Sequence, residues 1–185
     1  MTSKIQLINN ALILIGDLPV NDLVGNERPK VVANNLYDNI VQNELSKYRW
    51  GFARQKAQLS KWHTGPVGTE YSSKYQLPSD MMVLIKLNPS IPYNVLNGQV
   101  YCNYSDTLYC DYIADTDESN WPPYFSKMIE YALAKDFAIP IRDSSSSKQE
   151  MANEYVIQSR MARYADAQQH PITPIADRPF IDVRF

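Results

Sequence analysis

The stretch Tyr48-Arg49-Trp50-Gly51-Phe52-Ala53 marks the place where the periodicity of this sequence changes. Before it, from about Asn26 to Lys47, apolar residues recur at helical spacing, and after it apolar and polar residues begin to alternate as they do in strands. The glycine lets the backbone turn without a clash of a Cβ atom. We therefore expect a corner between a helical layer and a sheet, with the rings of Trp50 and Phe52 filling the seam. The alternative is that these rings contact a partner.

Two helices are predicted before the corner. Ser3 is a good N-cap and Gln6 completes a capping-box pattern, so the first helix is expected over residues 4–15. Asn26 is expected to cap the second helix, whose first turn tolerates Pro29 because that position needs no N–H. The two helices are predicted to pack on each other as a hairpin.

Strands are predicted after the corner. Residues 52–59 and 81–87 have strand character, and the glycine-rich residues 62–69 are expected to form an exposed loop tip. The strongest hairpin signal is Asn97-Gly98, which is the preferred sequence of a two-residue type I′ turn.

A second hairpin is predicted to turn near residues 105–107. If its turn centres on Asp106, Cys102 and Cys110 would face each other across the two strands. The simplest interpretation of the pair is two small, half-buried side chains. Disulfides are not expected, because we expect the protein to be made in a reducing cytosol.

Two further helices are predicted near the end of the chain. Pro122-Pro123 opens the third helix, since proline suits the first helical positions, and Pro140 is expected to end it. The fourth is expected from Lys148 to Gln168 with Ser147 as its cap. Its predicted apolar face is thin, and Arg160 and its neighbour Arg163 indicate an exposed or interfacial side: Met151, Ala152, Tyr155, Ala162 and Ala165 form that face.

The last stretch, residues 170–185, contains three prolines and is not expected to be helical. It is too apolar for a disordered tail. We predict an extended arm that docks on a neighbouring subunit or a partner, and the alternative is an arm that folds back on its own sheet. The docking residues are expected to be its large apolar side chains: Ile172, Ile175, Phe180, Ile181, Val183 and Phe185.

The predicted fold class is therefore α+β. Helices 1–2 and 3–4 are expected to form a discontinuous four-helix bundle from residues 1–50 and 118–169. Residues 51–117 would be an inserted antiparallel β-sheet domain, and residues 170–185 the extended C-terminal arm.

Composition excludes several classes of function. The formal net charge of −2 argues against a dedicated nucleic-acid binder, which usually carries a basic excess. Two cysteines and two histidines, His63 and His170, do not make a zinc site. No apolar run approaches the ~20 residues of a membrane span, and no signal peptide is expected. The 13 tyrosines suit half-buried strands, or alternatively a protein interface.

No catalytic constellation is predicted, so we do not expect an enzyme, a cofactor or a metal. Neither histidine has a neighbouring pattern that marks a nucleophile and its base. The acidic run Asp115, Asp117 and Glu118 lacks the glycine turn and the ligand number of a calcium loop, and is interpreted as a solvated linker. A glycosidase-like carboxylate pair, Glu70 and Asp80, is a minor alternative.

Four short motifs in order resemble the head-to-tail adaptor of short-tailed bacteriophages, also called tail tubular protein A. They are the helix ending Ala11-Leu12-Ile13-Leu14-Ile15-Gly16 with its proline loop, the corner at Trp50-Gly51-Phe52, the turn Tyr75-Gln76-Leu77-Pro78-Ser79-Asp80, and the helix entry Trp121-Pro122-Pro123-Tyr124-Phe125. Each motif is weak alone, and together they cover most of the chain.

The resemblance implies a structural protein of the virion tail, made in the host cytoplasm during assembly. It implies a dodecameric ring under the portal protein that continues the DNA channel and seats the tail nozzle (tail tubular protein B) and the tail fibres. The free protein is expected to be monomeric, and DNA would cross the lumen without specific binding.

Two alternatives remain open at this point. One is a cell-wall-degrading enzyme carried in the tail, which turnover of peptidoglycan and its loss on mutation of a carboxylate such as Glu70 would reveal. The other is an α+β interaction domain unrelated to phages.

Overall fold

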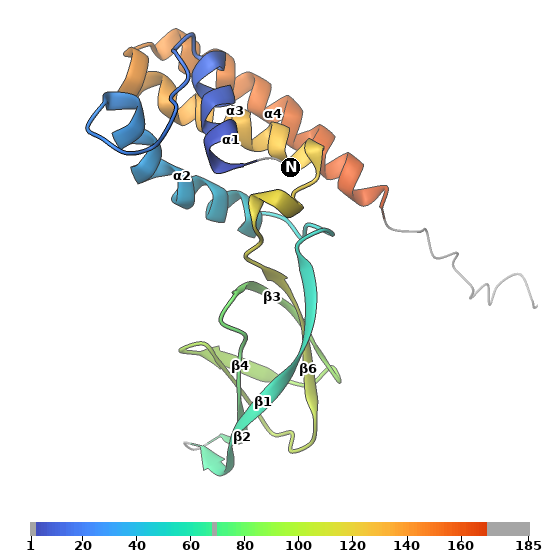
Figure 1. Cartoon of the computed structure of the whole chain (residues 1–185). Coiled ribbons are helices and arrows are strands. Elements are labelled where there is room, and N and C mark those ends of the chain that lie inside the picture. The colour runs from blue at the N-terminus through green and yellow to red at the C-terminus, as the bar shows by residue number, and fades with distance from the viewer. Residues whose placement is uncertain (1–2, 68–69, 170–185) are drawn as a thin grey trace, which may run out of the picture.

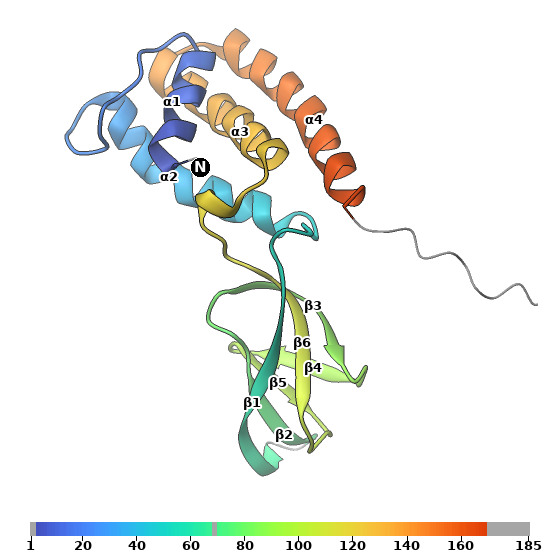
Figure 2. The same cartoon turned by 45° about the vertical axis from the view of Figure 1, so that its right-hand side comes forward.

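A computed structural model describes residues 3–67 and 70–169 of the chain. Figure 1 shows an upper body of helices joined to a lower sheet region, and a turned view separates the two further (Figure 2). These described residues form four α-helices and a six-stranded antiparallel sheet, so the protein is α+β, as predicted.

The helical body consists of α1 (Lys4–Leu14), α2 (Arg28–Ser46), α3 (Pro123–Arg142) and α4 (Ser145–Ala167). The most deeply buried helix is α3, and α1, α2 and α4 all pack on it. The predicted α1–α2 hairpin is wrong, because these two helices touch each other only slightly. The physical reason is that α3 has apolar side chains on most of its circumference, so it can bury the faces of three neighbours.

The helix ends differ from the predictions in three places. Ser3 caps α1 as expected, but α2 begins after Glu27 rather than Asn26. Pro140 lies inside the last turn of α3, which continues to Arg142 because Ile141 is buried in the core. The cap of α4 is Ser144, whose Oγ accepts the N–H of Ser147 at 3.1 Å, so the helix begins three residues earlier than predicted.

The sheet has the strand order β3-β6-β1-β2-β5-β4, and every neighbouring pair is antiparallel. Its strands are β1 (Arg54–Val67), β2 (Tyr71–Gln76), β3 (Met81–Asn88), β4 (Tyr93–Leu96), β5 (Gln99–Cys102) and β6 (Leu108–Ala114). The first half of β1 pairs with β6 and the second half pairs with β2, so this strand joins the two halves of a curved sheet. The curve encloses a second, smaller core around Tyr75, Val100 and Leu108.

The predicted loop tip at residues 62–69 is wrong over residues 62–67, because β1 continues to Val67; residues 68–69 lie outside the described residues. Strand β2 offers a partner along this length, and a cross-strand partner overrides the local turn composition. Two register irregularities in this part of the pair accommodate the glycine- and proline-containing sequence.

The Asn97-Gly98 hairpin is confirmed: it joins β4 and β5, and both residues have positive φ, 51° and 71°. The second predicted hairpin is wrong, because β5 pairs with β2 and β4 whereas β6 pairs with β1 and β3. Both edges of each strand are therefore occupied, and Cys102 and Cys110 do not face each other across a strand pair. Both are buried free thiols of the smaller core.

Candidate functional site

The corner between α2 and β1 is packed into the helical core. Trp50 is 1% exposed, and its ring lies edge-on to that of Phe125 with the centroids 5.0 Å apart. The centroid of Phe52 is 4.8 Å from that of Phe125. The indole N–H of Trp50 donates to the carbonyl oxygen of Glu44 at 3.0 Å. These contacts fix the start of the sheet against α2 and α3.

A buried carboxylate ties the corner to α4. Asp166 is 1% exposed, and its two oxygens accept the backbone N–H of Gly51 at 3.0 and 2.9 Å. One of them also accepts the hydroxyl of Tyr124 at 3.0 Å. Burial, followed by the hydrogen bond to Asp166, raises the pKa of Tyr124 above its ordinary value. Sequence reasoning missed Asp166, because no local pattern separates one acidic residue of a polar helix from the others.

A second buried carboxylate links α2 to α4. The Glu44 side chain is 3% exposed, and it accepts the hydroxyl of Tyr155 at 2.7 Å and the ammonium of Lys47 at 2.6 Å. Burial, and then Glu44 itself, raises the pKa of Tyr155. Helix α4 is therefore held at two points: Tyr155 bonds to Glu44 of α2, and Asp166 bonds to Gly51 of the corner.

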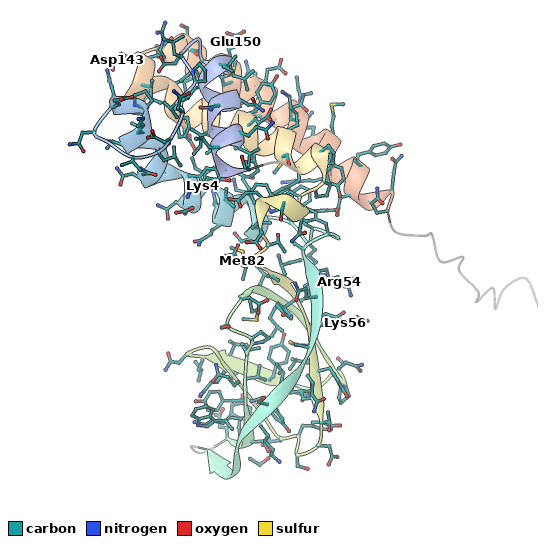
Figure 3. The ribbon with its side chains drawn as sticks, in the orientation of Figure 1. Lys4, Arg54, Lys56, Met82, Asp143 and Glu150 are labelled. Carbon is teal, nitrogen blue, oxygen red and sulfur yellow. The ribbon has the colours of Figure 1, made fainter. Side chains whose placement is uncertain are left out.

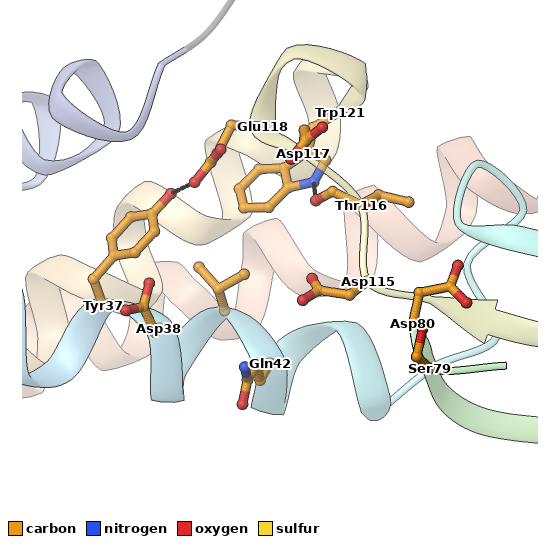
Figure 4. Close-up of a pocket in the computed structure, with 11 residues that line it drawn as sticks. Tyr37, Asp38, Gln42, Ser79, Asp80, Asp115, Thr116, Asp117, Glu118 and Trp121 are labelled. Atoms are coloured by element: carbon orange, nitrogen blue, oxygen red, sulfur yellow. Dashed lines mark hydrogen bonds between the residues drawn. The ribbon is translucent and has the colours of Figure 1, made fainter.

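A cleft of about 560 Å³ opens where α2 meets the segment after β6 and the turn before β3 (Figure 4). Its polar wall is strongly acidic, and its apolar wall includes the rings of Tyr37 and Trp121. The carboxylates that line it come from three separate parts of the chain: Asp38, Asp80, Asp115, Asp117 and Glu118. Three of these carboxylates form the acidic run predicted as a solvated linker, and no sequence pattern places the other two beside it.

Hydrogen bonds within the wall hold several of these groups. The hydroxyl of the buried Tyr37 donates to Glu118 at 3.0 Å, and the indole N–H of Trp121 donates to the carbonyl oxygen of Thr116 at 2.9 Å (Figure 4). Burial, with the charge of Glu118, raises the pKa of Tyr37. Asp38 pairs with Lys4 at 2.7 Å.

The chemistry of the cleft is that of a negative surface. Its described lining contains no histidine, lysine or arginine. Within residues 3–67 and 70–169, no three His, Cys, Asp or Glu side chains are placed to hold a metal ion. The arrangement suits contact with positively charged groups.

The outer face of the β1–β6–β3 region has the opposite charge. Arg54 and Lys86 both reach the carboxylate of Asp111, and Lys56 lies opposite Asp111 in the strand register. Figure 3 shows Arg54 and Lys56 on β1 below the helical body. The hydrogen bond from Arg54 is the main cause that holds the pKa of Asp111 below its ordinary value. Three cations thus surround one carboxylate.

The structure separates the minor carboxylate pair. Glu70 is exposed beside the β1–β2 tip, whereas Asp80 lines the cleft at the helical end. The six residues of β2 lie between them in sequence, which corresponds to about 20 Å of strand. Glu70 and Asp80 therefore do not form a glycosidase-like pair.

The outer side of α4 carries four exposed apolar side chains, which we call the α4 stripe. Val156, Ile157, Met161 and Tyr164 are 43%, 48%, 59% and 69% exposed. Their spacing places them on one side of the helix, opposite the side that packs on α3, and Figures 1 and 2 show α4 at the outer edge of the bundle. This second apolar set was not predicted, although its helical spacing is present in the sequence.

The predicted docking arm lies outside the described residues, and so do all of its apolar residues: Ile172, Ile175, Phe180, Ile181, Val183 and Phe185. Of the two histidines, His170 is outside as well, and His63 belongs to β1. No helix in the described part of the chain is both long and apolar enough to cross a membrane.

Neither the models of known protein families nor the curated protein sequences with which the chain was compared give a match.

Proposed function

We propose that this protein is a head-to-tail adaptor of a short-tailed bacteriophage, a ring-forming structural part between the portal and the tail nozzle. The proposal rests on the ordered set of four motifs that resemble this family. The α+β architecture is consistent with that resemblance, because the second motif is the corner itself, the third precedes β3 and the fourth opens α3.

Three features of the molecule support a structural role. The corner is hydrogen-bonded to α4 through Gly51 and Asp166, and these bonds hold the start of the sheet against the helical body. The acidic cleft and the basic outer face of the sheet offer complementary charges to neighbouring subunits. The slightly acidic chain suits a channel through which DNA passes, because a basic lining would hold phosphates.

Assembly on the portal is the proposed mechanism. The free chain is a monomer, and the portal acts as the template on which the ring forms. The apolar residues of segment 170–185 dock on the portal or on the next subunit, and their burial offsets the entropy of ordering the segment.

The test is the mass of the protein alone and after mixing with the portal of a short-tailed phage, by native mass spectrometry or light scattering. The expected result is a monomer that converts to a portal-bound ring. A chain that stays monomeric in the presence of the cognate portal would remove the proposal.

A matched pair of variants locates the docking region. A chain that ends at Gln169 is expected to lose portal binding, whereas Trp62→Ala, at an exposed side chain of β1, is expected to retain it. Portal binding that survives the truncation would contradict a docking role for residues 170–185.

A further inference from the structure

Strand β4 is an edge of the sheet whose outer side pairs with no strand in the described part of the chain. It stands at the end of the strand order, where its partner is β5. All four of its residues are exposed, and its large apolar side chains, Tyr93, Val95 and Leu96, are 37%, 44% and 56% exposed. Because both faces of the strand are open, nothing but its backbone edge decides what it accepts.

The two edges of the sheet differ in how they are protected. Edge strands are usually kept from pairing with other chains by a charged side chain, a bulge or a covering segment. The edge strand β3 has Lys86 and two register shifts against β6. In β4 the residues Tyr93–Leu96 carry no charge, and the register with β5 is regular. Strand β4 is therefore the edge that is suited to accept another strand.

The hairpin determines which backbone groups of β4 point outward. Asn97-Gly98 forms a two-residue turn, and in such a hairpin the two residues that flank the turn exchange both of their N–H···O bonds. Leu96, and by alternation Asn94, therefore bond to β5. The N–H and C=O groups of Tyr93 and Val95 point away from the sheet.

We infer that β4 pairs antiparallel with β4 of a second copy of this chain, with Asn94 on the two-fold axis. In this register Tyr93 of each copy lies opposite Val95 of the other. These are the residues whose backbone groups point outward, so each such pair exchanges both of its N–H···O bonds. Every outward N–H and C=O group of Tyr93 and Val95 then has a partner.

The side chains on the inner face also match. Residues directly opposite each other in paired strands lie on the same face of the sheet. Tyr93 and Val95 lie on the face of the smaller core, because they are opposite Cys102 and Val100 of β5, which are both 0% exposed. An aromatic ring beside a β-branched side chain is a favourable cross-strand pair. The second copy would thus extend the apolar face of the smaller core beyond its edge.

On the opposite face, Asn94 meets Asn94 of the second copy. Its Nδ2 donates to the hydroxyl of Tyr71 at 2.6 Å, and an amide has a second N–H and an acceptor oxygen with which it can bond to its own copy. Pro92 lies opposite Leu96 of the second copy. By the same alternation, an N–H at Pro92 would not point to the outer edge, so the missing donor costs the pair nothing.

The contact is small, and this sets its strength. Each copy contributes the four residues of β4, whereas a stable interface takes about 20–30 residues a side. We therefore expect a weak, reversible dimer, and a chain that is monomeric at the micromolar concentrations of a mass measurement. A contact between identical surfaces closes after two copies and cannot build a larger ring. The pair therefore belongs to the free chain, and the inference does not rest on the proposed function.

Disulfide formation between copies tests the register. Two Asn94→Cys residues on the axis would have Cα atoms about 4.5 Å apart, within the range of a disulfide. Two Leu96→Cys residues would be four residues apart along the strands, about 13 Å, which is out of reach. The native Cys102 and Cys110 are 0% exposed.

With diamide as the oxidant, the Asn94→Cys chain should form a disulfide-linked dimer at least about tenfold faster than the Leu96→Cys chain at the same concentration. Each rate is divided by the rate at which the same thiol reacts with glutathione disulfide, which removes differences in thiol reactivity. Equal corrected rates, or a faster Leu96→Cys chain, would overturn the inference.

Association of the chain without added cysteines is the second test. Sedimentation equilibrium up to about 1 mM should show a dimer. Asn94→Asp should weaken it at least about threefold, because two like charges meet on the axis. Asn39→Asp, the same change on the exposed side of α2, should leave it unchanged. A chain that stays monomeric throughout, or equal weakening by both variants, would contradict pairing through β4. A chain that pairs through β4 but ignores the portal keeps this inference and removes the proposed function.

Discussion

Three tyrosines of the helical body and the buried Tyr75 of the sheet region donate to different kinds of acceptor. In the helical body, Tyr37, Tyr124 and Tyr155 each donate to a carboxylate far away in sequence: Glu118, Asp166 and Glu44. In the sheet region, Tyr75 is 1% exposed and donates to two backbone carbonyl oxygens of the loop before β6, at 3.0 and 2.7 Å. The other buried tyrosine there, Tyr112, has longer contacts, with its hydroxyl 3.3 Å from acceptor oxygens of Gln55 and Asp80.

The difference shows what each region depends on. The helices are joined by bonds to ionised groups in a poorly hydrated setting, where loss of a charge or of a partner is costly. The curved sheet depends on backbone geometry, because its turns and register set which side chains reach the smaller core. The helical body should respond most to changes in charge and pH, and the sheet region most to changes in backbone conformation.

The largest loss of stability is expected from a substitution at the corner between α2 and β1. Trp50→Ala removes a 1% exposed ring from the aromatic cluster and leaves the carbonyl oxygen of Glu44 without its donor. We expect the free energy of unfolding to fall by about 3–5 kcal/mol, measured by urea denaturation. The control Trp62→Ala, at a 63% exposed residue, should change it by less than about 0.5 kcal/mol. Similar losses in both variants would mean that the corner is not a point of special stability.

The next effect concerns the buried carboxylate of α4. Asp166→Asn keeps the shape but replaces one acceptor oxygen by a donor that faces the N–H of Gly51. The expected loss of unfolding free energy is about 1.5–3 kcal/mol, as for hydrogen bonds to charged groups. Asp117→Asn, on the exposed loop, serves as the matched control and should be nearly neutral. A neutral Asp166→Asn would show that the tie between corner and helix contributes little.

The sequence predicted local features well and non-local ones poorly. The capping of α1 by Ser3 and the Asn97-Gly98 turn were correct, because each is determined by a few neighbouring residues. The second hairpin was wrong, because β5 finds its partners in β2 and β4 rather than in the next strand along the chain.

The candidate site shows the same limit. The acidic cleft brings together Tyr37, Asp80 and Glu118, which are separated by tens of residues. No spacing in the sequence predicts that they lie close together. The α4 stripe could have been predicted, because Ile157, Met161 and Tyr164 recur at helical spacing on the side opposite the expected apolar face.

The dependence of stability on pH should separate the half-buried Tyr124 from an exposed tyrosine. The pKa of Tyr124 is raised by burial and by Asp166, so the unfolded chain releases this proton near pH 10 while the folded chain retains it. Stability is therefore fully present below about pH 10 and is lost as the pH rises above it, by up to about 1.4 kcal/mol per pH unit for each such tyrosine.

Urea midpoints measured between about pH 8 and 11 check this expectation. Tyr124→Phe should make the decline shallower, whereas Tyr109→Phe, at a 45% exposed side chain, should leave its slope unchanged. An equal slope in the wild type and Tyr124→Phe would contradict the proposed origin of the decline.

The smallest effect tests whether the two regions unfold together. Gly98 in the β4–β5 turn and Gly16 after α1 both have positive φ, 71° and 75°, and a Cβ atom at either would meet nothing within 4 Å. Alanine at each position should therefore lower the unfolding free energy by a similar amount, about 1 kcal/mol, through conformational strain alone.

Hydrogen exchange measured by mass spectrometry reports on each region separately. If the joint at Trp50 and Asp166 couples the regions, either variant raises exchange in the core strands and in α3 alike. If Gly98→Ala raises exchange only in the strands, the sheet unfolds independently of the helical body. The contacts of the corner would then set the orientation of the two regions but would not make them unfold together.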